Sequence, residues 1–523
     1  MNGTSDQAAL VRALARSIGG SAPAAVLETH ISYVLLTGEY AYKIKKQVAF
    51  GFLDFSTLAA RRSFCEQELR LNRRLAPALY LDVVPITGSA DAPRLGGEGT
   101  ALEYAVKMRE FPQSELAATL LARGELRPAD IDALAIRVAG FHAAIDVADA
   151  AGAFGTPDGV LGLALRNVEE IAPLIAADSE RRQLDRLREW TEGEHRRLGA
   201  SFEQRRARGF VRECHGDLHL GNIARIDGEL VIFDCIEFNE EMRWIDVMSE
   251  IAFTVMDLED RGRADFAHRF LNAYLEHTGD YAGLAVLPFY LAYRALVRAK
   301  VALLRAAQAG AGAGTARVEA RAYLHLASKY AKPPRPALIV TYGLSGSGKT
   351  TLSEALLERI GAVRLRSDVE RKRIHGLAPL ERAGATIGGG LYSPAATDST
   401  YERLRSLARE IVDAGRTAIV DAAFLRRSQR EPFRALAAEL GVPFVILVFE
   451  ASEATLRQRV AVRDARGDDA SDADLAVLGH QLAAREPLAA EERACAVVYD
   501  AEAPLAAARA PGAWTEISRR LGG

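Results

Sequence analysis

Cysteine is scarce in this chain, and the few cysteines are far apart. Four occur in 523 residues, at Cys65, Cys214, Cys235 and Cys495. Such scattered positions indicate neither a disulfide framework nor a zinc cluster, because both require characteristic close spacings. The sequence therefore predicts a protein of a reducing compartment, and we expect it in the cytoplasm.

Long apolar runs and an excess of one charge are also missing. No run approaches the ~20 apolar residues of a membrane-spanning helix, and the first residues lack the basic and apolar segments of a signal peptide. The formal net charge of −3 gives no electrostatic reason to expect nucleic acid or an anionic membrane as a partner. The composition therefore predicts a soluble globular protein, and the sequence indicates no oligomeric state.

Lysine is rare, with 9 lysines against 57 arginines. Since the chain uses arginine by default, a lysine at a chemically demanding position is informative. Three lysines lie together at Lys43, Lys45 and Lys46, and another, Lys349, lies in a glycine-rich segment.

The length of the chain predicts more than one domain, because 523 residues exceed one ordinary hydrophobic core. Two consecutive prolines in residues 332–336 stop any helix and mark a linker. Before it, residues 1–110 combine strand and helix patterns, and residues 111–331 are mainly helical. After it, residues 337–523 form the last domain.

Strand-like and helical patterns alternate beyond the linker. This alternation predicts a parallel, doubly wound sheet. The expected strands are residues 336–342, 362–366, 417–421, 443–449 and 496–500.

A phosphate-binding loop is predicted at residues 343–350, Gly-Leu-Ser-Gly-Ser-Gly-Lys-Thr, between the first of these strands and a helical pattern. Glycines allow the backbone to curl so that its N–H groups point at a phosphate, and the following helix adds its positive N-terminal end. Lys349 can then reach the β- and γ-phosphates and Thr350 can bind Mg²⁺.

Other polar residues follow the later strands of this domain. Asp368 ends the second strand and is a candidate base for an acceptor hydroxyl, or alternatively a helix N-cap, and Arg371 could hold an anionic acceptor. Asp421 ends the third strand, where a carboxylate can contact Mg²⁺. Arg459 and Arg463 are four residues apart on one helix face and could close over the transferring phosphate, or form a solvated face.

A second, separate set of residues for phosphate transfer lies at 215–234. His-Gly-Asp217-Leu-His-Leu-Gly-Asn222 is followed by an apolar strand ending in Asp234. Protein-kinase catalysis uses this spacing: a loop Asp near the acceptor hydroxyl, an Asn five residues later, and an Asp at a strand end. Hard oxygen ligands suit Mg²⁺, and a carboxylate can accept the proton of the attacking hydroxyl.

The His-Gly-Asp-Leu-His-x-x-Asn segment resembles the catalytic loop of the aminoglycoside phosphotransferase family, which has a kinase-like fold. The resemblance covers about residues 30–300. It implies that Asp217 is the catalytic base and that Asn222 and Asp234 hold Mg²⁺.

A kinase-like fold also requires a strand lysine paired with a helix glutamate. Lys43 ends a Tyr-Ala-Tyr-Lys strand pattern, and Lys45 lies on the same strand face. Residues 56–75 form the expected helix, with Ser56 as N-cap and with Glu66 and Glu68 as candidates. We prefer Lys43 and Glu68, which would contact ATP, and leave Lys45 and Glu66 as alternatives.

The last domain resembles small P-loop kinases of the gluconate-kinase, zeta-toxin and polynucleotide-kinase type. The whole chain resembles the family of bifunctional aminoglycoside phosphotransferase-like/ATP-binding proteins. The implied fold class is α/β and α+β multidomain: a bilobal kinase-like domain, then a P-loop domain with a parallel sheet. Besides Lys43 and Glu68, the expected ATP-binding residues are Gly343, Ser345, Gly346, Ser347, Gly348, Lys349, Thr350, Thr351, Arg459 and Arg463.

These patterns predict an ATP-dependent phosphotransferase with two kinase-like sites that acts on small-molecule hydroxyls with ATP and Mg²⁺. Asp217 carries the first site, and Lys349 and Asp368 carry the second. Two alternatives remain open: one domain is a nucleotide-sensing ATPase module that regulates the other, or the P-loop domain is a toxin-like kinase directed at nucleotides or proteins.

Overall fold

The computed structural model forms two compact units, one of residues 1–164 and 202–257 and the other of residues 165–201 and 258–523. The structure describes residues 3–19, 22–50, 53–308, 312–333, 335–378, 381, 391, 393–466 and 473–522. Pro334, in the predicted linker, lies outside the described residues.

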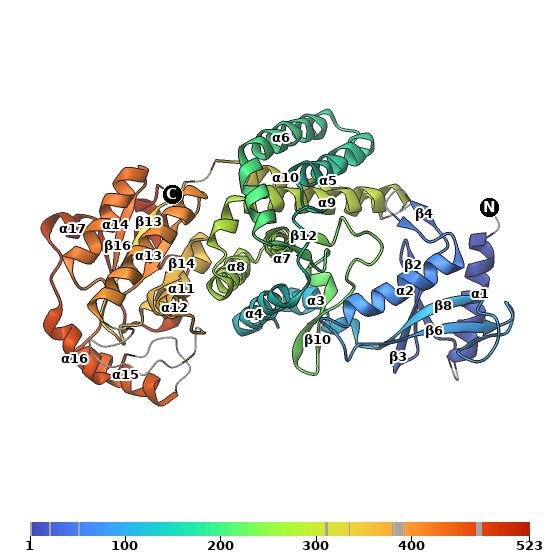
Figure 1. Ribbon diagram of the computed structural model, residues 1–523, viewed down its shortest axis with the longest axis horizontal. Helices are drawn as coiled ribbons and strands as arrows, with labels where there is room; N and C mark the ends of the chain where they lie inside the picture. The colour runs from blue at the N-terminus through green and yellow to red at the C-terminus, as the bar shows by residue number, and fades with distance from the viewer. Residues whose placement is uncertain are drawn as a thin grey trace. The chain divides into compact units, whose positions relative to one another are not determined.

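An antiparallel sheet forms the N-terminal part of the first unit (Figure 1). Its strand order is β1-β2-β3-β8-β6-β7. Adjacent residues of β8 face opposite sides, so Ala105 packs with helix α1 and Val106 packs against helix α2 and its surroundings. The bounds are α1 Gly3–Ile18, β1 Ala25–Glu28, β2 Ser32–Leu36, β3 Tyr40–Lys45, β4 Ala49–Phe50, β5 Leu53–Asp54, α2 Leu58–Asn72, β6 Tyr80–Gly88, β7 Pro93–Leu95 and β8 Glu103–Arg109.

Helix α2 begins one residue later than the sequence suggests. The side chain of Thr57 accepts the N–H of Ala60, so Thr57 is the N-cap and the prediction of Ser56 was wrong. Both residues are good caps, and a one-residue difference cannot be decided from propensity.

The rest of the first unit is helical, with two short two-stranded sheets, β10-β11 and β12-β9. Helices α5, α6 and α7 each contribute residues to both units. Helix η2 lies wholly in the second unit. In chain order, the elements of this stretch are η1 Gln113–Glu115, α3 Ala117–Ala122, α4 Pro128–Ala144, α5 Pro157–Ile171, η2 Ala172–Leu174, α6 Asp178–Ala207, β9 Val211–Glu213, η3 Leu220–Asn222, β10 Ile223–Ile226, β11 Glu229–Ile232, β12 Trp244–Asp246 and α7 Val247–Asp260.

Five parallel strands form the centre of the second unit, in the order β14-β15-β13-β16-β17. Each predicted strand is present within two residues of its expected start. The strands are β13 Leu338–Tyr342, β14 Val363–Arg366, β15 Ala418–Asp421, β16 Phe444–Glu450 and β17 Ala496–Asp500. The predicted fold class is therefore confirmed.

Helices accompany this sheet (Figure 1). The helices between residue 261 and the sheet belong to the same unit as the sheet. The earlier ones are α8 Ala264–Thr278, η4 Tyr281–Ala285, α9 Leu287–Gln308 and α10 Ala313–Tyr330. The others are α11 Lys349–Ile360, α12 Ser367–Ile374, α13 Pro394–Asp413, α14 Arg427–Leu440, α15 Glu453–Arg466, α16 Leu475–Ala484, α17 Ala490–Ala494, α18 Leu505–Arg509 and α19 Thr515–Arg520.

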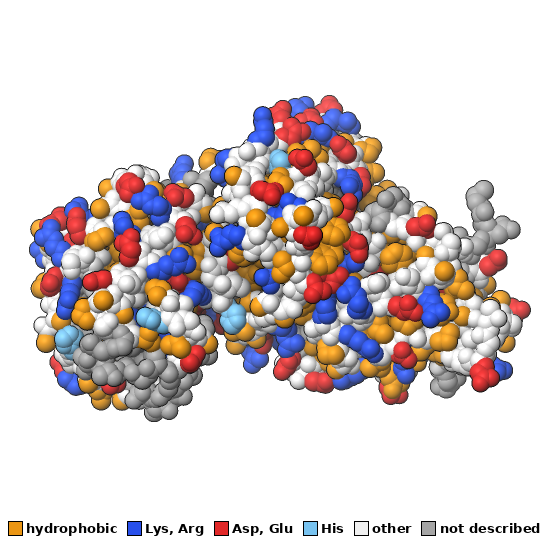
Figure 2. Space-filling view, viewed as in Figure 1, with side chains coloured by type: hydrophobic (Ala, Val, Ile, Leu, Met, Phe, Trp, Pro, Cys, Tyr) orange, Lys and Arg blue, Asp and Glu red, His pale blue; other side chains and the backbone are white. Residues whose placement is uncertain are grey.

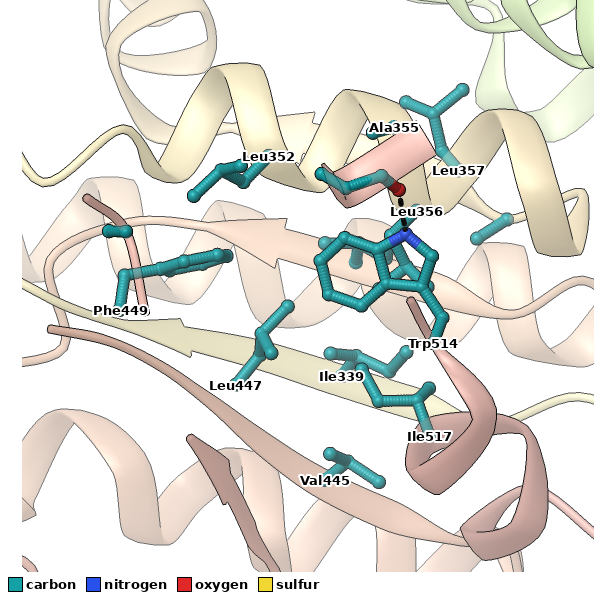
Figure 3. Packing of buried hydrophobic residues seen from close by; sticks show 14 residues of the cluster. Ile339, Leu352, Ala355, Leu356, Leu357, Val445, Leu447, Phe449, Trp514 and Ile517 are labelled. Atoms are coloured by element: carbon teal, nitrogen blue, oxygen red, sulfur yellow. Dashed lines mark hydrogen bonds between the residues drawn. The ribbon is translucent and has the colours of Figure 1, made fainter. Parts of the chain in front are cut away.

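The core of the parallel sheet fixes helix α11, which follows the phosphate-loop sequence. Figure 3 shows Leu352 and Leu356 of α11 packed over Ile339 and Leu447 of the sheet. Trp514 closes this cluster, and its indole N–H donates to the main-chain oxygen of Ala508 at 2.8 Å. Burial of such side chains contributes roughly 1.5–3 kcal/mol each. This packing therefore stabilises the position of α11 on the sheet.

The surface carries charges of both signs. On the face shown in Figure 2, basic and acidic side chains are interspersed. Within the described ranges, no helix combines the length and apolar character needed to cross a membrane.

Candidate active sites

A buried carboxylate holds the loop that carries Asp217. Glu250 of α7 accepts the N–H groups of His215 at 2.6 Å and Gly216 at 2.9 Å. Gly216 has φ +87°, and a Cβ there would lie 2.7 Å from the main-chain oxygen of Met242. Only glycine fits this conformation without strain, so the backbone before Asp217 has one well-defined course.

Asp217 and Asn222 are in direct contact. The Nδ2 of Asn222 donates to the main-chain oxygen of Asp217 at 3.0 Å and to its Oδ2 at 2.9 Å. These bonds use the amide nitrogen and leave the Oδ1 of Asn222 as the atom suited to a hard cation. The side chain of Asp217 is 35% exposed, which leaves its carboxylate accessible to a substrate.

Asp234 follows β11 in an unusual backbone conformation. Its φ is +64°, which is rare outside glycine and costs about 1 kcal/mol or more. The N–H of Asp234 donates to the hydroxyl of Tyr80 at 3.1 Å, and its carboxylate lies 2.5 Å from the ammonium of Lys43. The turn thus directs a 43% exposed carboxylate toward the strand lysine.

Both candidate lysines bind the same glutamate. The ammonium of Lys43 lies 2.8 Å from Oε1 of Glu68, and that of Lys45 lies 2.7 Å from Oε2. Lys45 also pairs with the buried Glu237, whereas Lys43 also pairs with Asp234. Both lysines therefore belong to one network, and Lys43 is the one that contacts a predicted metal ligand.

Electrostatics keep Lys43 and Glu68 ionised despite their burial. Burial opposes the charge on Lys43, but the carboxylates of Asp234 and Glu68 raise its pKa well above the usual value. Burial likewise opposes the charge on Glu68, but Lys43 and Lys45 lower its pKa to about 2. Glu66 is half exposed and pairs with Arg62 at 2.8 Å, away from this network.

The phosphate loop of the second unit has the backbone shape that its glycines predict. Gly346 and Gly348 have φ of +82° and +76°. A Cβ at Gly343 would lie 2.6 Å from Oγ of Ser347, and that hydroxyl is buried without a hydrogen-bond partner among the described residues. The N–H of Ser345 donates to Oε1 of Gln481 at 2.8 Å.

Lys349 and Thr350 begin helix α11 at the end of this loop. The ammonium of Lys349 donates to the carbonyls of Gly343 at 2.9 Å and Leu344 at 2.8 Å. Burial lowers the pKa of Lys349, although the carboxylates of Asp421 and Asp368 act in the opposite direction and raise it. Oγ1 of Thr350 lies 2.7 Å from Oδ2 of Asp421, which brings a hydroxyl and a carboxylate together as hard ligands. Thr351 follows in the same turn and is exposed.

Asp368 lies in the first turn of α12 and is not its N-cap. The cap residue is Arg366, so the N-cap alternative for Asp368 was wrong. Oδ1 of Asp368 accepts from Nη1 of Arg371 at 2.9 Å, and the Asp368 side chain is 25% exposed. A partly exposed carboxylate beside a buried guanidinium can bind a hydroxyl on an anionic compound.

Arg459 and Arg463 lie on α15 and belong to the surroundings of the loop. Nη2 of Arg459 donates to the main-chain oxygen of Ala501 at 2.9 Å, and Nη1 lies 3.7 Å from a Cβ built on Gly348. Nη2 of Arg463 donates to the main-chain oxygen of Ala473 at 2.6 Å. Arg459 is thus placed beside the loop backbone.

A cavity of about 360 Å³ opens beside the phosphate loop. It lies between the loop and the segments that follow β16 and β17. Its lining residues are Gly343, Leu344, Ser347, Phe449, Glu450, Ala451, Ser452, Leu456, Arg485, Asp500 and Glu502. Its size is in the range of small-molecule sites.

Several supporting residues cannot be identified from the sequence motifs. Glu250 and Tyr80 hold the loops of Asp217 and Asp234, and Gln481 holds the phosphate loop. Glu250 had one possible signal, since a carboxylate in the apolar stretch 247–258 must find partners when buried. Tyr80 and Gln481 carry no such signal, because their roles arise from long-range contacts.

Two family models match the chain. The model of the phosphotransferase enzyme family matches residues 52–287, and the model of an AAA domain matches residues 338–488. Together they cover the predicted site residues except Lys43, which lies before residue 52.

Curated relatives match along most of the chain. They are uncharacterized proteins of Mycobacterium tuberculosis and Mycobacterium bovis, each 31% identical over 468 residues, which is 88% of this chain and 90% of theirs.

Solved structures of kinases are also similar to the chain. A gluconokinase from Sinorhizobium meliloti is 25% identical, with 36% of this chain and 95% of that chain covered and a TM-score of 0.25. A choline/ethanolamine kinase family protein from Mesorhizobium loti is 12% identical, with 63% and 98% covered and a TM-score of 0.37.

Proposed function

We propose that this chain, which belongs to the family of bifunctional aminoglycoside phosphotransferase-like/P-loop ATP-binding proteins, phosphorylates hydroxyl groups of small molecules at two sites. The family membership, which the sequence motifs predicted, is confirmed, and the chain is a phosphotransferase. The proposal adds the acceptor class and the activity of both sites.

One observation supports the proposal: each site combines a partly exposed carboxylate with side chains suited to Mg²⁺ or phosphate. At the first, Asp217 contacts Asn222, which is on the same loop, and Asp234 contacts Lys43. At the second, the carboxylate of Asp368 stabilises the positive charge of Lys349 in the phosphate loop and so raises its pKa. A site that only bound or hydrolysed a nucleotide would need no carboxylate for an acceptor hydroxyl.

At the first site, Asp217 accepts the proton of the acceptor hydroxyl as the hydroxyl oxygen attacks the γ-phosphorus of ATP. The bond from that phosphorus to the β,γ-bridging oxygen breaks, and ADP leaves. The bond to Asn222 fixes the Asp217 carboxylate in one orientation, which removes the entropic cost of positioning it during the reaction. Lys43, held by Glu68, supplies a fixed positive charge to the phosphates of ATP.

At the second site, Lys349 supplies that charge, and Asp368 accepts the proton. The backbone N–H groups of Gly346 to Thr350 hold the phosphates, and Arg459 approaches from α15. Arg371 holds Asp368 in place.

The donor sets fit Mg²⁺. At the first site Asn222 and Asp234 would hold it, and at the second Thr350 and Asp421 would, since these are hard oxygen ligands. When bound, the ion offsets the negative charge of the phosphate oxygens.

We further propose the domain boundaries expected from the sequence and a cytoplasmic location. The domains are an N-lobe at 1–110, a helical C-lobe at 111–331, a linker at 332–336 and a P-loop domain at 337–523. The four cysteines are free, which supports a reducing compartment.

The test is a screen of hydroxyl compounds that follows ADP release by the full-length chain. Asp217→Asn silences the first site and Asp368→Asn the second, so each acceptor is assigned by the variant that loses it. Exposed Asp227→Asn, at the β10–β11 turn, and Glu402→Gln, on α13, are matched charge-removal controls. The proposal of two active sites fails if no acceptor depends on one of the two carboxylates. Turnover at the first site that requires an intact Lys349 would instead favour a regulatory P-loop module.

A further inference from the structure

Helix α8 belongs to the same compact unit as the parallel sheet and covers its edge strand (Figure 1). Among the described residues, strand β14 pairs with β15 alone, so the backbone groups on its other side need partners that are not strands. The N–H of Arg364 in β14 donates to Oδ1 of the buried Asn272 of α8 at 2.8 Å. The helix thus supplies a hydrogen-bond partner for one N–H on the outer side of the strand.

The side chain of Arg364 connects this contact to the phosphate loop. Its Nη1 donates to the main-chain oxygen of Thr350 at 2.5 Å, and Nη2 lies 3.5 Å from Oε2 of Glu276 on α8. Arg364 is 4% exposed and lies near the positive N-terminal end of α11. A buried guanidinium there requires counter-charges, and Glu276 provides one of them, with Glu354 of α11 at 3.7 Å as another.

Glu276 also binds the helix that carries Asp368. Its Oε1 lies 3.2 Å from Nη1 of Arg366, the cap residue of α12. Its main-chain oxygen accepts from Arg373, at the end of α12. One residue of α8 therefore contacts both ends of the helix that bears the proposed second base.

A second set of contacts holds the middle and the C-terminal end of α11. Nη1 of Arg269 lies 2.7 Å from Oε1 of Glu354 and 2.6 Å from Oε1 of Glu358. The ring of His268 lies against Gly361, where a Cβ would be 2.9 Å from Nε2. Helix α8 thus holds α11 along its length as well as at Thr350.

We propose that α8 is a positioning element of the P-loop site and that Glu276 is its positioning residue. Through Arg364 it fixes the main chain of Thr350, and through Arg366 and Arg373 it fixes α12. Because the phosphotransferase family model extends to residue 287, a helix of the first domain then completes the site of the second. The inference rests on the proposed function, in which Thr350 holds the metal and Asp368 acts on the acceptor.

The test uses the full-length chain with Asp234→Asn, which silences the first site. Glu276→Ala removes the counter-charge, and Glu276→Gln keeps an oxygen that accepts from arginine. Asp265→Asn is the control, because Asp265 lies on the same helix and pairs with Arg263, at its N-terminus. Two quantities are measured: hydrogen–deuterium exchange of residues 349–357 without nucleotide, and the Mg²⁺ concentration that half-saturates binding of a fluorescent ADP analogue.

We expect Glu276→Ala to speed exchange and to raise the half-saturating Mg²⁺ concentration about fivefold to tenfold, which is the effect of losing one typical hydrogen bond. Glu276→Gln should change both quantities in the same direction but by less. If Glu276→Ala does not fold, Glu276→Gln alone tests the inference. Exchange and Mg²⁺ dependence equal to those of the control, in either folded variant, would overturn the inference. If the parent chain shows no Mg²⁺-dependent binding, the proposed function of the site fails, and exchange alone still tests the positioning.

Discussion

Lys43 and Lys45 bind the two oxygens of one carboxylate, that of Glu68. They differ in their second partner, which is the half-exposed Asp234 for Lys43 and the buried Glu237 for Lys45. The same pair therefore contains a lysine directed at the active site and a lysine enclosed by the fold.

We predict that substitution separates these two roles. Lys45→Ala leaves two buried carboxylates with one fewer cation and should cost about 3–5 kcal/mol of unfolding free energy. Lys43→Ala should cost less stability, because Asp234 can be hydrated and Glu68 keeps Lys45. It should instead lower turnover at the first site about 10²-fold. Urea unfolding and initial rates measure the two effects, and equal stability losses would contradict the assignment.

Asp217→Asn should lower phosphotransfer at the first site by about 10²–10⁴-fold. The carboxamide cannot take the proton, but its oxygen can still accept from Asn222, so the loop should keep its shape. Nucleotide affinity should change little. Isothermal titration and initial rates check both statements, with Asp227→Asn as the control, and unchanged turnover with a genuine acceptor would refute the role of Asp217.

Asp368→Asn should abolish acceptor phosphorylation at the second site and leave ATP binding intact. Since Arg366 and not Asp368 is the cap residue, α12 should remain folded, and the Asn oxygen still accepts from Arg371. Circular dichroism, nucleotide binding and product formation are measured together. A variant that phosphorylates its acceptor at the wild-type rate would show that Asp368 is not the base.

His142 predicts a specific pH dependence of stability. Burial, with Arg212 nearby, lowers its pKa from the ordinary 6.5 to about 3. Between these values the unfolded chain binds a proton that the folded chain excludes, so stability falls as the pH decreases. One such proton contributes about 1.4 kcal/mol per pH unit. His142→Gln should remove this contribution from the pH dependence of the unfolding free energy. The substitution His277→Gln, at an exposed histidine, should not. Identical profiles for the wild type and His142→Gln would contradict the role of His142.

Cleavage of the linker should leave the two fragments associated. A protease site placed in residues 332–336 cuts the chain between α10 and β13, but Asn272, Glu276 and Arg269 still hold α8 on the sheet. Gel filtration after cleavage should show one peak at 0.15 M salt. Asn272→Ala with Glu276→Ala should separate the fragments, and separation of the unsubstituted pair would show that these contacts do not hold them.

Patterns within short segments were predictable from the sequence. The five parallel strands, the phosphate loop and the spacing of Asp217, Asn222 and Asp234 depend on local periodicity and on fixed offsets, and the structure contains these elements. The choice between Lys43 and Lys45 was not decidable, because residues two apart on a strand share a face, and both indeed reach Glu68.

Contacts between distant segments were not predictable. The link from Glu276 to Arg364, like that from Tyr80 to Asp234, joins residues far apart in sequence with no periodic signal in either segment. Their partners are set by how helices and sheet pack, which a single sequence does not reveal. For the same reason the sequence marked a boundary at 332–336 but gave no sign that α8 packs on the sheet beyond it.

The order of α8 and β14 along the chain has a consequence for biosynthesis. An uncovered edge strand can pair with other chains and aggregate, and this hazard is greatest while a protein is incompletely folded. Residues 264–278 leave the ribosome before residues 363–366. Helix α8 is therefore synthesised before β14, the edge strand that it contacts. A circular permutant that begins at the linker reverses this order, and it would expose a bare edge during every round of translation.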